Sequence, residues 1–144
     1  MSGIKRTAAD KNFSDAVRGA SDFVCQRCGI DGKHNKGMMD CSHIYSRKHR
    51  GLRWHPLNAL CLCRSCHAKI ADAPTEHAEL VKKLKGEDEY WMLFRERGRV
   101  AKIPKAMEKD ISKHYLAEVR RIQARRNAGF SGYVEIECWL DALL

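Results

Sequence analysis

The sequence predicts a small α+β domain, and three features of the chain lead to this prediction. Two Cys-x-x-Cys pairs enclose a central segment, Cys25 with Cys28 and Cys63 with Cys66. Between and just after them, two short runs with strand character are followed by a short helical run. These three runs cover residues 38–45, 58–62 and 63–71. Farther along, apolar side chains recur at helical spacing, which indicates a long amphipathic helix.

Further helices are predicted on both sides of the central segment. They cover residues 10–20, 75–85 and 87–97. Thr75 is the expected N-cap of the second of these helices, and Gly86 follows its end. Polar and glycine-containing stretches predict loops over residues 25–37 and 47–56. Residues 133–139 fit a strand or the start of a last helix equally well.

The long C-terminal helix is predicted over residues 104–127. Its apolar stripe recurs at spacings of four, four, four and three, in Met107, Ile111, Tyr115, Val119 and Ile122. Pro104 suits the first turn. We expect a core domain over residues 1–100 and a helical extension over 101–144 that packs on the same domain. The stripe could also pair with a second copy, which leaves a homodimer open.

Composition limits the kind of protein and the partners that it can have. A chain of 144 residues and 16.5 kDa corresponds to about one domain. The 27 Lys and Arg side chains against 18 Asp and Glu give a net charge of +9, which favours a polyanionic partner. There is no run of about 18 apolar residues, and the first ten residues lack the apolar part of a secretory signal. We therefore expect no membrane partner and a cytoplasmic location.

The two Cys-x-x-Cys pairs predict a zinc site. Each pair lies in a polar turn that can place two thiolates on one metal, and two pairs complete a tetrahedron. Arg27 and Arg64 lie inside the pairs and would offset the negative charge of the thiolates. Four thiolates leave no open position, so the zinc would be structural. The alternatives are ordinary buried cysteines, or a thioredoxin-like redox pair, which is disfavoured because no βαβ pattern is present.

Three polar residues complete a pattern across the two strands and the helix. His43 ends the first predicted strand, Asn58 begins the second, and His67 directly follows Cys66. This arrangement, with the Leu-Cys-x-x-Cys-His run at residues 62–67, resembles the ββα-metal site of HNH endonucleases. The segments FSDAVR, CQRCG, MDCSHIYSR and LRWHPLN are similar to the phage NinG/Rap nucleases. The resemblance covers residues 13–70.

The resemblance implies a metal-dependent DNA endonuclease with an HNH core. His43 would be the general base, Asn58 would brace the loop and orient His43, and His67 would bind a divalent cation such as Mg²⁺ or Mn²⁺. Many HNH proteins carry Asp or His just before the general base, where this chain has Ser42. Asp40 is our choice for the missing carboxylate ligand of the cation, with His55 as a second candidate.

A basic loop lies between the proposed base and Asn58. Residues 43–69 contain six Lys and Arg side chains and no Asp or Glu. Four of them are candidates for DNA phosphate contacts: Arg47, Lys48, Arg50 and Arg53. The competing interpretations are a non-catalytic zinc-ribbon DNA-binding protein and an accessory protein of phage recombination or packaging. The first keeps the zinc and the DNA binding but does not require His43 or His67. In the second, cleavage is incidental and residues 104–144 matter most.

Overall fold

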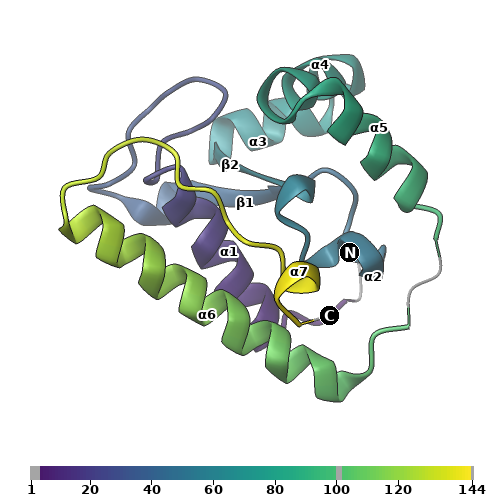
Figure 1. Cartoon of the computed structure of the whole chain (residues 1–144). Helices are drawn as coiled ribbons and strands as arrows, with labels where there is room; N and C mark the ends of the chain where they lie inside the picture. Colours follow the sequence, from purple (N-terminus) through teal and green to yellow (C-terminus); the bar gives the residue numbers. More distant parts are fainter. Residues whose placement is uncertain (1–3, 100–101, 144) are drawn as a thin grey trace.

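The computed structural model describes residues 4–99 and 102–143. It is an α+β structure in which helices surround a two-stranded antiparallel sheet (Figure 1). The strands are β1 (Met39–His43) and β2 (Ala59–Cys63), and α3 (Arg64–Ala71) begins directly after β2. The predicted α+β class is confirmed, as is the predicted order of two strands and a helix.

The sheet register places the two strands so that Cys41 faces Cys61 and His43 faces Ala59. Short 3₁₀ turns lead into the strands, η1 (Lys36–Met38) before β1 and η2 (Pro56–Asn58) before β2. Every residue of β2 is buried, whereas β1 is only partly covered. In the part of the chain that is described, β1 pairs with β2 alone, so no strand covers the other edge of β1.

Helix α1 (Ala8–Ala20) begins two residues before the predicted start. Thr7 caps it, because its side chain accepts from the backbone N–H of Asp10 while the Asp10 carboxylate accepts from the N–H of Thr7. The Thr-x-x-Asp spacing that makes this reciprocal cap is a recognised start signal.

The helices after the sheet differ in detail from the predictions. Residues 47–56 are not all loop, because α2 (Arg50–Arg53) forms a single helical turn there. The helix predicted from Thr75 is α4 (Pro74–Lys85), and its N-cap is Ala73 because Pro74 occupies the first turn. Helix α5 (Glu87–Glu96) follows after Gly86, whose φ of 109° lets the chain turn sharply between the two helices.

The C-terminal part packs back onto the N-terminal helix. Helix α6 (Lys105–Asn127) confirms the predicted long helix, and it lies beside α1 (Figure 1). Residues 133–138 are extended without forming a strand, and a short helix α7 (Trp139–Leu143) follows. One core combines side chains from all these regions, among them Phe13, Trp54, Ile111, Tyr115 and Trp139.

The predicted boundary between a core domain and an extension, at residues 100 and 101, lies outside the described residues. On either side of it, the two parts of the chain contribute to the same hydrophobic core. None of the helices that the structure describes is both long and apolar enough to cross a membrane.

Candidate functional site

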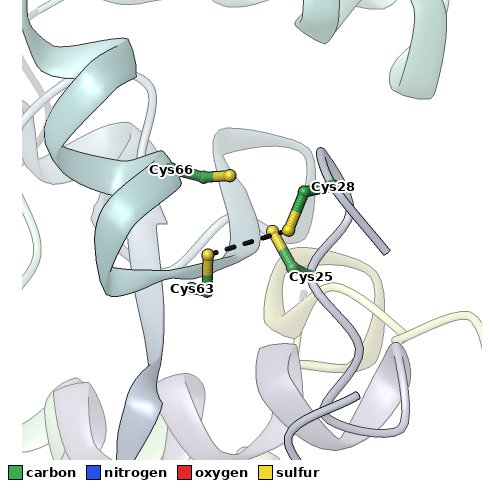
Figure 2. A group of neighbouring side chains, drawn as sticks. All are labelled: Cys25, Cys28, Cys63 and Cys66. Carbon is green, nitrogen blue, oxygen red and sulfur yellow. Dashed lines mark hydrogen bonds between the residues drawn. The ribbon is translucent and has the colours of Figure 1, made fainter. Parts of the chain in front are cut away.

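The four cysteines of the two Cys-x-x-Cys pairs converge on one point (Figure 2). Their sulfur atoms all lie within 4.8 Å of one another, and those of Cys28 and Cys63 are 3.8 Å apart. Zinc–sulfur bonds of about 2.3 Å in a tetrahedron place the sulfurs about 3.8 Å apart, so the donor set fits such an ion. This cluster could hold a metal such as zinc.

The surroundings of the cluster shift the pKa values of its thiols in different directions, because burial raises the pKa of Cys66 whereas that of Cys25 is lowered. Burial opposes ionisation of Cys25, but hydrogen bonds from the backbone of Cys28 and Cys63 lower its pKa to about 7. The guanidinium of Arg27 lies 3.4 Å from the sulfur of Cys66. The cluster ties the loop before β1 to the end of β2 and to the start of α3, the helix that carries His67.

Two of the three predicted catalytic residues, His43 and His67, border one open cleft of about 540 Å³, whereas Asn58 does not line it. His43, His67 and Asp40 line it together, from β1 and α3. Four arginines complete its wall: Arg6, Arg18, Arg47 and Arg64. In the described chain, β1 pairs along one edge only, and the cleft runs along its other edge. Residues from both faces of the strand, such as Asp40 and His43, therefore line the cleft. The structure therefore places the predicted base and the predicted cation ligands beside a strongly basic surface.

His43 is held by one backbone carbonyl. Its Nε2 lies 3.2 Å from the carbonyl oxygen of Arg53. A carbonyl can only accept, so Nε2 carries the hydrogen and the neutral ring has its lone pair on Nδ1. The ring also packs on Phe13, with centroids 5.9 Å apart. Burial lowers the pKa of His43, and the nearby Arg47 cation acts in the same direction, so the neutral ring is favoured.

Asn58 fixes the loop between the strands. It is completely buried, its amide nitrogen donates to the carbonyls of Tyr45 and Leu52, and its amide oxygen accepts from the N–H of Tyr45. These three bonds tie both ends of the basic loop to the start of β2. All three bonds go to the loop and none goes to His43, so Asn58 acts on His43 through the loop.

Asp40 and His67 lie side by side, with Oδ2 of Asp40 3.0 Å from Nδ1 of His67. Arg64 is also near Asp40, at 3.4 Å. A carboxylate and an imidazole are ligand types that divalent transition-metal ions accept. Within residues 4–99 and 102–143, however, the four cysteines are the one group with three or more metal-ligating side chains close together. A cation at Asp40 and His67 would therefore take its remaining ligands from water or substrate. His55 lies outside the cleft, in a different hollow.

The four predicted phosphate-binding residues are not equivalent. Lys48 is exposed, and Arg47 lines the cleft. The guanidinium of Arg50 instead donates to the carbonyl of Ile103 and lies 3.3 Å from the carboxylate of Glu108. Arg53 is 5% exposed, and its Nε and Nη2 donate to both oxygens of Asp10. Arg53 is thus part of the protein interior and is not placed to meet a phosphate.

Sequence reasoning missed three groups at this site. Arg6 and Arg18 join the cleft from the N-terminal helix region, and Asp10 contacts the segment behind His43. The Thr-x-x-Asp signal could have marked Asp10 as a capping residue, but nothing in the local sequence shows its second partner, Arg53. Comparisons with protein families, with curated proteins and with solved structures give no match.

Proposed function

We propose that this chain is a metal-dependent DNA endonuclease of the HNH type that hydrolyses phosphodiester bonds. The observation that carries the proposal is the meeting of His43, Asp40 and His67 in one cleft walled by four arginines. Such a cleft attracts a polyanion and offers a base and a pair of cation ligands at the same place. The proposal extends to a phage source and to a role in DNA recombination, which rest on the sequence resemblance alone.

The chemistry assigned to the chain begins at His43. The neutral ring, with its lone pair on Nδ1, takes a proton from a water molecule as the water oxygen attacks phosphorus. The bond from phosphorus to the 3′-oxygen breaks, and that oxygen leaves as an alkoxide that takes a proton from solvent water, so the products carry 5′-phosphate and 3′-hydroxyl ends. The arginines of the cleft hold the flanking phosphates. Asn58 keeps the intervening loop in place.

Two metals belong to the proposal. A structural zinc would be bound by Cys25, Cys28, Cys63 and Cys66 and would hold β2 and α3 against the loop before β1. A divalent cation such as Mg²⁺ or Mn²⁺ on Asp40 and His67 would offset the charge that develops on the phosphoryl oxygens.

A plasmid-nicking assay across a series of divalent metals tests the proposal. Wild-type protein should cut only with a suitable cation, and His43→Ala should cut at least about a hundredfold more slowly because it lacks the base. His34→Ala is the matched control, since His34 is an exposed histidine of the loop before β1. His43→Ala protein that cuts as fast as wild type would reject the base and favour a zinc-ribbon DNA-binding protein.

A further inference from the structure

A buried carboxylate lies at the same cleft as the candidate base. Asp10, on α1, is 6% exposed and accepts hydrogen bonds from five donors. Two come from the Thr7 cap, through its N–H and its hydroxyl. The other three come from the C-terminal end of α2, with Nε and Nη2 of Arg53 at 2.9 and 2.6 Å and the indole N–H of the C-cap residue Trp54 at 3.0 Å. A cap alone does not need these last three bonds.

The two residues that Asp10 holds by their side chains also present their backbone carbonyls to other groups. The carbonyl of Arg53 accepts from Nε2 of His43. The carbonyl of Trp54 accepts from the hydroxyl of Tyr115, which is completely buried on α6. The segment is therefore anchored from α1 by its side chains and from α6 by its backbone, and one of its carbonyls sets the orientation of the His43 ring.

We propose that Asp10 is a positioning residue for His43. Asp10 accepts hydrogen bonds from the Arg53 guanidinium and the Trp54 indole, and these bonds fix the position of the Arg53 carbonyl. Nε2 of His43 donates to that carbonyl, which leaves Nδ1 as the proton acceptor. Loss of the carboxylate leaves the segment with its anchor to Tyr115 alone, so the Arg53 carbonyl moves and the ring loses its fixed orientation. The consequence for cleavage rests on the proposed function, whereas the consequence for the His43 ring does not.

Asp10→Asn tests this inference, with Glu118→Gln as the matched control. Glu118 is also 6% exposed and also accepts two bonds from an arginine, Arg121, but it lies on α6 away from the cleft. The first measurement is the NMR signal of the His43 Nε2 proton, which a hydrogen bond to a carbonyl protects from exchange with water. The second is the single-turnover cleavage rate, measured with zinc content and DNA affinity.

We expect wild type and Glu118→Gln to show the protected proton and Asp10→Asn to lose it. The single-turnover cleavage rate of Asp10→Asn at saturating DNA should fall about tenfold to a hundredfold, because misplacing a reacting group costs rates of this order. If Asp10→Asn does not fold, Arg53→Lys replaces it, since lysine keeps the charge but cannot make the paired bonds.

Two results would overturn the inference. One is the absence of a protected Nε2 proton in wild type, and the other is an Asp10 variant that matches Glu118→Gln in both the proton signal and the rate. A third outcome separates the two proposals. If the wild type shows the protected proton but does not cut DNA, and Asp10→Asn loses that proton, the proposed function is refuted and the positioning role stands.

Discussion

His43 and His67 border the same cleft but have different neighbours, and this difference separates their expected roles. His43 donates to the Arg53 carbonyl and packs on Phe13, so its ring is held by the protein alone. His67 has a side chain that is 41% exposed and meets the carboxylate of Asp40. One ring suits proton transfer, and the other suits shared ligation of a cation.

The two histidine variants should therefore respond differently to metal. We expect raising the concentration of Mn²⁺ to restore part of the cleavage lost in His67→Ala, because Asp40 and the phosphate still offer ligands. It should restore nothing in His43→Ala, which lacks the base. Cleavage rates measured along a metal titration test this, and equal recovery of both variants would contradict the division of roles.

Buried carboxylates make stability depend on pH. Glu118 accepts both Arg121 nitrogens and the backbone N–H of Glu137. Although burial opposes ionisation, these bonds and the arginine charge hold the pKa of Glu118 below its ordinary value. A lowered folded pKa means that the ionised group stabilises the fold above its ordinary pKa of about 4.3, and that this stability is lost as the pH falls through the folded value.

Glu118→Gln should consequently cost about 2 kcal/mol of unfolding free energy at pH 7, and the difference from wild type should shrink below about pH 4. Urea unfolding of both proteins at several pH values measures it. Glu79→Gln, at an exposed position, is the control and should cost little at any pH. A cost for Glu118→Gln that does not change with pH would contradict the ion-pair explanation.

Strand β2 and helix α3 join at Cys63, where the sheet meets the cysteine cluster. If zinc binds there, its binding energy is part of the folding energy of both elements. We expect about one zinc per chain, and a chelator should unfold the sheet and α3.

Cys63→Ser should lose the metal and the fold together. Cys138→Ser should keep both, because Cys138 is buried in the other core, away from the cluster. Elemental analysis and circular dichroism measure the two effects, and a folded, zinc-free protein would contradict the prediction.

Most elements could be predicted because their signals are local. The apolar stripe of α6 repeats at helical spacing, and the two strands are short apolar runs next to cysteine turns. The errors arose where a stronger local signal was overlooked: Thr7 and Asp10 start α1 as a reciprocal cap, and Pro74 starts α4. Residues 133–138 stayed ambiguous because their extended form is set by contacts with distant segments, such as the bond from Val134 N–H to the Ala20 carbonyl.

The site was only partly predictable for a related reason. Asp40 could be chosen from its position on β1, and the structure brings it to His67. The burial of Arg53 could not be foreseen, since its partner Asp10 is 43 residues away in sequence and an arginine in a basic loop is usually solvated. For the same reason Arg6 and Arg18 were not assigned to the cleft, which exists only once α1 packs beside the sheet.

The proposed function makes the basic cleft the DNA-binding surface of the molecule, so DNA affinity should fall steeply with salt. Each phosphate contact releases counterions, and the logarithm of the affinity should decline linearly with the logarithm of salt concentration. Replacing Arg6 and Arg47 by alanine should reduce that slope by about two and weaken binding to all sequences alike. Arg99→Ala is the control, because Arg99 pairs with Glu96 outside the cleft. Affinity that is insensitive to salt would contradict a phosphate-binding role for the cleft.

The packing of α1 against α6 also determines when the protein can fold during its synthesis. Asn12 bonds to Ser112, one hundred positions later, and Phe13 is buried against Tyr115. Contacts of such long range form late, because the intervening chain has to be present first. A ribosome will have made the sheet, the cysteine turns and His43 well before it makes α6, so the emerging chain leaves Phe13 uncovered by Tyr115 at that stage. The core around Phe13 and Trp54 therefore closes only after translation has passed α6.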